Sequence, residues 1–363
     1  MRTTLLSVTF LFLALPFFAH AQEIVQDSTA FIKARVVEVS LSELRTVPGT
    51  QTQTTYQTIR AQFLEGDKKG EIIELENDYL AMETGDVFYV RVITDAINGT
   101  QLFSVAEPYR LPALLTLAGL FLLCLFIFGG KQGIRGLLAL IGSLFFISFL
   151  LLPGILAGYS PILVSIGVAS LIIVLGSYVT HGFNRTTTAA VVGMLVTVAI
   201  TGLIAHFSVH GAHLSGFGSE EAVYLNFDTG GSIDIVGLLL GSMLIGFLGV
   251  LYDAAIGQAV AVEELARAGN YLKPKEIYLR AIRIGREHIG ALVNTLAIAY
   301  VGVALPLLLL LKVSYTQSLL VTVNQELFAT EIIRLLVGSI GIILAVPVTT
   351  AVAVWVLAKK EQE

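Results

Sequence analysis

The chain has 363 residues, of which 55% are hydrophobic and 13% are charged, and its formal net charge is −5. With a mean hydropathy of +0.81, this composition lies outside the range of ordinary soluble domains and predicts a polytopic membrane protein. Because Cys124 is the single cysteine, an intrachain disulfide and a cysteine-based metal site are excluded.

Residues 1–21 have the pattern of an export signal. Arg2 precedes an apolar core from Leu5 to Phe18, and the small-x-small sequence Ala19-His20-Ala21 follows. Two interpretations are open: cleavage after Ala21, or retention of the segment as an N-terminal anchor helix.

Residues 22–110 have the composition of a water-soluble β domain outside the cytoplasm. Five strand-like runs are separated by turn sequences such as Gly66-Asp67, and they cover Phe31–Ser40, Thr54–Phe63, Gly70–Glu76, Val87–Thr94 and Leu102–Ala106. Their number and length predict a small closed or half-open barrel, with the OB-fold as the suggested topology. Since no basic groove with interleaved aromatic residues is evident, nucleic acid is not an expected ligand. The domain is expected to brace the membrane part or to contact a partner.

After Arg110 the hydropathy pattern predicts a seven-helix transmembrane domain over residues 111–358. The seven predicted spans are Leu111–Phe128, Leu137–Leu156, Pro161–Val179, Thr188–Phe207, Ile235–Val260, Ile289–Leu311 and Ile332–Leu357. Each is long enough to cross a hydrocarbon core of about 30 Å. The proline residues Pro306 and Pro347 lie inside spans and are expected to kink them.

The charges of the connecting loops predict the orientation. The loops on one side carry Lys131, Arg135, Arg185, Arg267, Lys273, Lys275, Arg280, Arg283, Arg286, Lys359 and Lys360, whereas the other side has only Arg110, Lys312 and Arg334. By the positive-inside rule the first side is cytoplasmic. The β domain is therefore expected outside the cytoplasmic (inner) membrane, and the tail of residues 359–363 in the cytoplasm.

The basic loop contains an amphipathic helix at residues 274–288, with Pro274 as its first residue. Its cations include Lys275, Arg280, Arg283 and Arg286, which lie on one face. Such a helix is expected to lie along the inner membrane surface and to contact anionic lipid through these four residues. It would either fix the ends of two spans or act as a coupling or regulatory element.

Asp253 in the fifth span is the principal candidate for a functional residue, because a carboxylate within an apolar run is costly and usually functional. Gly249 and Gly257 lie four residues to either side of it, and Gly237 and Gly241 have the GxxxG spacing. All four glycines are therefore expected to permit close helix packing. Asp253 would serve either as an ion or proton relay or as a structural carboxylate near the inner interface.

Polar residues elsewhere supply expected partners for Asp253. On the sixth span these are Asn294 and Thr295, and the supporting candidates are Tyr252, Tyr300, Glu263 and His288. Asn294 shares a face with Gly290, which a close neighbour could approach.

Three histidines occur at i, i+4 and i+7, namely His206, His210 and His213. Zinc favours such donors, but Gly211 and Gly216 interrupt a helix at this position. Interfacial packing and solvation are therefore expected here, rather than a metal site.

Motifs of the common enzyme classes are absent from the sequence. It contains no P-loop, no Gly-x-Ser-x-Gly elbow, no His-Glu-x-x-His and no dinucleotide fingerprint. Neither a cofactor nor an enzymatic activity is expected, and an intramembrane or metal-dependent activity is the weakest of the alternatives.

The most specific sequence lies in the sixth span and before it. It reads Ile284-Gly285-Arg286-Glu287-His288-Ile289-Gly290, then Asn294-Thr295-Leu296-Ala297-Ile298-Ala299-Tyr300, with Leu305-Pro306 beyond. With the export signal, the β domain and Tyr252-Asp253, this pattern resembles the YibE/F-like family of bacterial multi-pass membrane proteins. The resemblance implies this architecture and singles out Asp253, Asn294 and Thr295, but it implies no particular activity.

A partial similarity to RND-type exporters and to accessory subunits of protein export suggests a mechanism. Tyr252-Asp253, then Glu263-Glu264-Leu265, a basic linker and a helix containing threonine are similar to a half-repeat in which a membrane acid relays protons. The small external domain and the helix count depart from that pattern. The predicted function is ion- or proton-coupled transport or export assistance. The alternative is a non-transporting scaffold or envelope-assembly factor whose β domain binds a partner.

Overall fold

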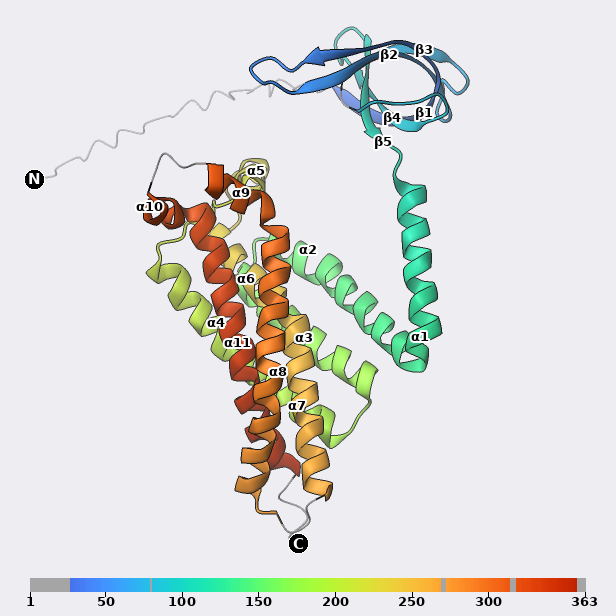
Figure 1. Ribbon diagram of the computed structural model, residues 1–363. Helices are drawn as coiled ribbons and strands as arrows, with labels where there is room; N and C mark the ends of the chain where they lie inside the picture. Colours follow the sequence, from blue (N-terminus) through green and yellow to red (C-terminus); the bar gives the residue numbers. More distant parts are fainter. Residues whose placement is uncertain (1–26, 79, 269–271, 314–317, 358–363) are drawn as a thin grey trace, which may run out of the picture. The chain divides into compact units, whose positions relative to one another are not determined.

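The chain divides into two compact units, residues 1–122 and 123–363 (Figure 1). The computed structural model describes residues 27–78, 80–268, 272–313 and 318–357. The predicted export signal and the tail of residues 359–363 lie outside these residues.

The N-terminal unit contains a five-stranded antiparallel sheet with the strand order β3-β2-β1-β4-β5, curved into a half-barrel (Figure 1). The strands are β1 (Ser28–Thr46), β2 (Gln53–Phe63), β3 (Ile72–Asn77), β4 (Val87–Thr94) and β5 (Gln101–Pro108). All five predicted strands are confirmed, and β4 has the predicted bounds.

The long strand β1 produces the curvature of the sheet. Its first part pairs with β4 and its later part with β2, so that Ala34 and Arg35 pair on both sides. Register shifts between Val36 and Glu38, and again beyond Val39, bend the strand. Alternate side chains point to one face, and the large residues Phe63 and Phe88 are fully buried there.

The C-terminal unit is helical. The division between the two units falls inside the first helix, α1 (Leu111–Phe146). The elements that follow are a π-helical turn (Ile147–Leu151), α2 (Leu152–Leu156), α3 (Pro161–His181), α4 (Arg185–Gly211), α5 (Glu220–Asp228), α6 (Ile235–Gly246), α7 (Leu248–Ala268), α8 (Pro274–Val303), α9 (Leu305–Val313), α10 (Leu319–Asn324) and α11 (Glu326–Leu357). Helix α11 is central, because it packs against α4, α7 and α8.

Five helical stretches of the described residues are long and apolar enough to cross a membrane. They are Leu111–Leu156, Pro161–His181, Arg185–Gly211, Ile235–Ala268 and Glu326–Leu357, and α8 with α9 makes a sixth if the bent pair is one span. The prediction of a multi-pass membrane protein is confirmed. Two differences separate this count from the predicted seven. The expected loop of residues 129–136 is helical and joins the first two predicted spans, with Gly130 alone departing from helical geometry at φ 50° and ψ −140°. The sixth predicted span falls in the bent α8–α9 pair.

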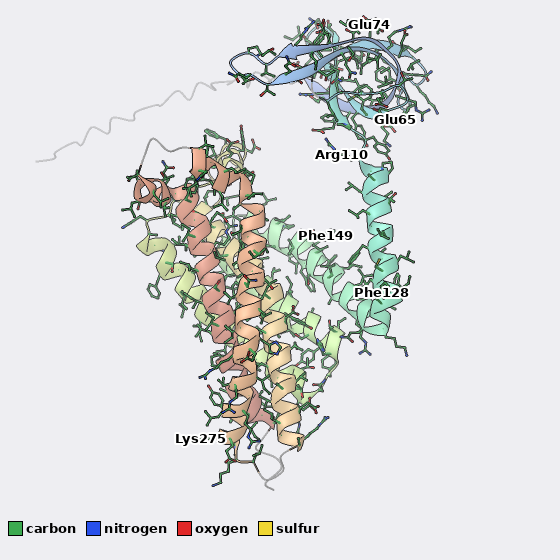
Figure 2. The ribbon with its side chains drawn as sticks, viewed as in Figure 1. Glu65, Glu74, Arg110, Phe128, Phe149 and Lys275 are labelled. Atoms are coloured by element: carbon green, nitrogen blue, oxygen red, sulfur yellow. The ribbon has the colours of Figure 1, made fainter. Side chains whose placement is uncertain are left out.

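Helix α1 is apolar, and none of its side chains is buried. Phe128 is 85% exposed, and Phe149 in the following π-helical turn is 64% exposed (Figure 2). In a chain that enters a bilayer, such side chains are suited to lipid contact.

Two long helical runs are interrupted. Phe247 separates α6 from α7, and Ala304 separates α8 from α9 with a bend of 66°. The second interruption confirms the kink expected at Pro306, since proline has no N–H to donate and its ring clashes with the preceding turn. Helix α11 continues through Pro347.

The expected surface helix at residues 274–288 is instead the first half of α8, which runs without a break to Val303. Ile277 and Ala281 are buried in the core that α7 and α11 share with α8, so the apolar face covers protein rather than headgroups. The cations Lys275, Arg280, Arg283 and Arg286 are exposed, and Lys275 lies at the end of the bundle beside the α7–α8 connection (Figure 2).

Candidate functional site

Asp253 on α7 opens into a cavity of about 370 Å³ that also has walls from α8 and α11. Gly257, Gln258, His288 and Val346 are among the other lining residues. Asp253 lies near the middle of the helical run Ile235–Ala268. Across the described residues, its carboxylate has neither a hydrogen-bond partner nor an ion-pair partner, so it is available to a proton, a cation or water entering the cavity.

The glycines expected to pack tightly fall into two groups. A Cβ at Gly237 would meet Asp234, the N-cap of α6, and Pro161 on α3, and a Cβ at Gly241 would meet Ser165 and Pro161 on α3. At Gly249 and Gly257 an added Cβ would meet none of the described atoms within 4 Å. Gly257, one turn beyond Asp253 on α7, lines the cavity with it.

Gly285 on α8 lies close to Gln258 on α7. A Cβ at Gly285 would lie 2.7 Å from Oε1 of Gln258 and would also meet Val346. Gln258 is 4% exposed and donates from Nε2 to the carbonyl oxygen of Ala281 at 2.8 Å. Sequence reasoning missed this pair, although an uncharged polar residue within an apolar helix was an available signal.

His288 shares the cavity with Asp253, whereas Asn294 and Thr295 do not line it. Asp253, His288, Asn294 and Thr295 are all exposed, and Thr295 donates its hydroxyl to the carbonyl oxygen of Ala291 at 2.9 Å. Ile284, His288 and Leu292 recur every four residues and therefore share one helical face. Asn294 is two residues beyond Leu292 and faces another direction, which explains why the expected pairing with Asp253 is not formed.

Tyr252 and Tyr300 also point away from Asp253. Tyr252 donates to the carbonyl oxygen of Gly176 on α3 at 3.4 Å. The Tyr300 hydroxyl lies only 2.6 Å from the position that a Cβ would take at Gly246. Since Gly246 is the last residue of α6 and Tyr300 is close to the end of α8, the two helix interruptions lie near one another.

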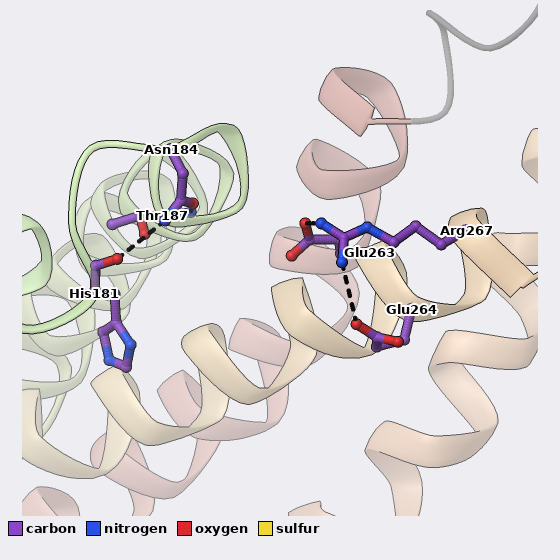
Figure 3. A network of polar contacts seen from close by, with 6 residues as sticks. All are labelled: His181, Asn184, Thr187, Glu263, Glu264 and Arg267. Carbon is purple, nitrogen blue, oxygen red and sulfur yellow. Dashed lines mark hydrogen bonds and ion pairs between the residues drawn. The ribbon is translucent and has the colours of Figure 1, made fainter. Parts of the chain in front are cut away.

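Glu263 lines a separate cavity of about 120 Å³ beside the α3–α4 turn, with His181 and Asn184. Asn184 caps α4 by accepting from the amide of Thr187 at 2.7 Å, and it donates to the carbonyl oxygen of His181 at 3.0 Å (Figure 3). Glu263 forms an ion pair with Arg267 at 2.6 Å. Its charge is therefore compensated within α7, in contrast to that of Asp253.

Two of the three histidines on the fourth predicted span and beyond it lie close together. The rings of His206 and His210 lie 4.1 Å apart, and Nδ1 of His210 is 2.8 Å from the carbonyl oxygen of His206. His213 follows the end of α4 with φ at 53°, so helical spacing does not extend to it. Among the residues that the structure describes, no group of three or more potential ligands is placed to hold a metal ion.

The shared cavity predicts energetic coupling between Asp253 and His288. In a double-mutant cycle, Asp253→Asn and His288→Gln are expected to depart from additivity in unfolding free energy by about 0.5 kcal/mol or more. Asp253→Asn and Asn294→Leu should add to within roughly 0.5 kcal/mol, because the two side chains lie on different faces. Unfolding in detergent, followed by circular dichroism, measures both cycles. Coupling of Asp253 to Asn294 but not to His288 would contradict this geometry.

In a comparison with known protein families, residues 117–359 match the family model described as YibE/F-like protein. No match is found among curated proteins. Solved structures likewise give no match. The matched region covers more than half of the chain and includes every helix that lines the Asp253 cavity, and the chain therefore belongs to the YibE/F-like family.

Proposed function

We propose that this protein couples the movement of protons or another cation to transport or to export assistance, with Asp253 as the relay. The observation that carries this proposal is an exposed carboxylate, without a partner among the described residues, in a cavity of about 370 Å³ that His288 also lines and within a long apolar run. A carboxylate at the centre of a membrane helix costs roughly 2.5–3.5 kcal/mol on insertion scales. The presence of Asp253 despite this cost is explained if its carboxylate binds and releases a proton during transport. The proposal includes no enzymatic step.

The interrupted helices support a transport role. Secondary transporters commonly build their sites from discontinuous helices, because an interruption frees backbone groups to bind an ion or a substrate. Here α6–α7 and α8–α9 are both interrupted, and Tyr300 contacts Gly246 close to both breaks. Asn294 and Thr295 follow His288 on α8, and we assign them to the remainder of this pathway rather than to direct contact with Asp253.

A seven-span arrangement in a bacterial inner membrane is part of the proposal. At 1.5 Å per residue, the 46 residues from Leu111 to Leu156 would extend about 69 Å, more than twice a hydrocarbon core of about 30 Å. The non-helical Gly130 would divide them into two crossings, and the bent α8–α9 pair would supply one more. The positive-inside rule then puts the β domain outside the cytoplasm.

We further propose an OB-like topology for the β domain. The antiparallel pairings make β3 and β5 run in the same direction, and these edge strands contact one another. Such closure is expected of a five-stranded, partly open Greek-key barrel.

Proton uptake into proteoliposomes under an imposed membrane potential tests the relay. The full-length protein should acidify the vesicle interior, and Asp253→Asn should reduce uptake to the rate of empty vesicles. Glu264→Gln is the matched control, because it removes an exposed acid from the same helix and should leave uptake unchanged. Equal uptake by Asp253→Asn and the unmodified protein would exclude the relay.

The alternative is a scaffold or envelope-assembly factor that transports nothing. The exposed apolar surface of α1 favours it, since such a helix can bind a partner helix as well as lipid. In that case no protein-dependent proton uptake is expected, and proteins from the envelope should copurify through the β domain or α1.

A further inference from the structure

We propose that the cavity between α5, α6 and α11 is a binding site for a small zwitterion, a molecule that carries both an ammonium and a carboxylate group. This cavity has a volume of about 260 Å³ and is distinct from the Asp253 cavity, with which it shares no residue. The proposal is independent of the proton relay.

Both signs of charge line the cavity. Glu331 and Arg334 form an ion pair on α11 with a distance of 3.5 Å between Oε1 and Nη2, and Glu221 contributes a further carboxylate from α5. Nε of Arg334 is buried and has no hydrogen-bond partner among the described residues. Because a buried donor without a partner costs about 1–3 kcal/mol, a ligand carboxylate that accepts from it would be stabilised.

Thr330 supplies a second unsatisfied polar group. It is 6% exposed, lines the same cavity, and its hydroxyl has no partner in the part of the chain that the structure describes. Thr295 and Thr350 donate their hydroxyls to the carbonyl oxygen four residues earlier, as helical threonines commonly do. Thr330 makes no such bond, so its hydroxyl is available to a ligand.

Neighbouring contacts hold the cavity in place. The carboxylate of Glu326, one turn before Thr330, accepts from the amide of Ser215 at 2.8 Å, from its hydroxyl at 2.7 Å, and from the amide of Gly216 at 2.7 Å. These three bonds fix the segment after α4 against the start of α11. A site built in advance loses less conformational entropy on binding.

The charges select the class of ligand. A simple anion would be attracted to Arg334 but repelled by Glu221 and Glu331, whereas a simple cation would be repelled by Arg334. A molecule with both groups can direct its carboxylate to Arg334 and Thr330 and its ammonium to the glutamates. The remaining walls include apolar side chains such as Leu225 and Leu238, and the volume is below the range of about 300–1,000 Å³ that is typical of drug-sized ligands. Both features fit a small amino acid with a short side chain.

Isothermal titration of the full-length protein in detergent tests this site with L-alanine as the probe. Propionate lacks the ammonium group and ethylamine lacks the carboxylate, and each should bind at least tenfold more weakly than L-alanine. Thr330→Val should weaken L-alanine binding by about tenfold, which corresponds to ~1.4 kcal/mol. Thr330→Ser keeps the hydroxyl and should retain binding, which separates a lost hydrogen bond from a disturbed fold.

Glu220→Gln is the matched control for Glu221→Gln, because both residues lie in the first turn of α5 and only Glu221 lines the cavity. Binding should weaken in Glu221→Gln and stay unchanged in Glu220→Gln. Equal affinities for L-alanine and propionate would overturn the proposal in favour of a simple anion site. Absence of saturable L-alanine binding to the unmodified protein would overturn it outright.

Discussion

Gly193→Leu is expected to prevent α4 from packing on α11 and to leave the helical bundle unfolded in detergent. A Cβ added at Gly193 would lie 2.8 Å from Cα and 2.9 Å from Cβ of Thr349. These atoms belong to the backbone and the first side-chain carbon, so no rotation of Thr349 can make room. Overpacking of this kind typically costs about 1–3 kcal/mol for a small group, and leucine adds three further carbons. Thermal unfolding followed by circular dichroism should show the loss, with Gly193→Ala as the milder member of the series.

Gly167→Ala on α3 is the control for this series. An added Cβ at Gly167 would meet nothing within 4 Å, so alanine should stabilise its helix by roughly 0.5–1 kcal/mol. Thr349→Ala should not rescue Gly193→Ala, since Cα and Cβ remain at that position. Similar stability of Gly193→Ala and Gly167→Ala would show that α4 and α11 are not in close contact.

The surroundings of the other glycines show why glycine spacing alone does not predict which helix faces pack closely. Gly237 and Gly241 have a close neighbour, while Gly249 and Gly257 lie at helical spacing on an open face. Periodicity establishes that two residues share a face of a helix. What the face meets depends on the neighbouring helices, and these are distant in sequence.

Elements with a strong local signal were predictable. The alternation in Val87–Thr94 predicted β4 with its observed bounds, and Pro306 predicted the break between α8 and α9. The turn between the first two predicted spans lacked a comparable signal, and there the structure departs from helical geometry at Gly130 alone. Charge alone could not show that residues 274–288 continue into the sixth span, because an amphipathic face can cover protein as well as lipid.

The candidate site was predictable in its central residue and not in its surroundings. Asp253 was evident because a lone acid in an apolar run is rare. The rotation of α8 places His288 in the cavity that Asp253 lines, and it directs Asn294 to another face of the helix. The cavity beside Arg334 combines α5, α6 and α11, so no single segment of the sequence indicated it.

A large effect is also expected in the β domain, where Gln57→Leu should destabilise the half-barrel. Gln57 is 4% exposed on β2. Its Nε2 donates to the carbonyl oxygen of Met82 at 3.0 Å, and its Oε1 accepts from the Met82 amide at 2.8 Å and from Nδ2 of Asn77 at 3.0 Å. The side chain of Gln57 thereby binds the backbone of the segment before β4, as a neighbouring strand would, and attaches this segment to the sheet.

Leucine at position 57 is one atom shorter and offers neither a donor nor an acceptor, so the amide and the carbonyl of Met82 would be buried without their partner. At about 1–3 kcal/mol for each group, the expected loss is roughly 2–6 kcal/mol, a large part of the ~5–15 kcal/mol that stabilises a typical domain. Hydrogen exchange on the full-length protein should show faster exchange throughout β2 and β4. Gln53→Leu, at the exposed start of the same strand, should change stability by no more than about 0.5 kcal/mol. If both variants exchanged at the same rate, the bonds of Gln57 to Met82 would not contribute to the stability of the barrel.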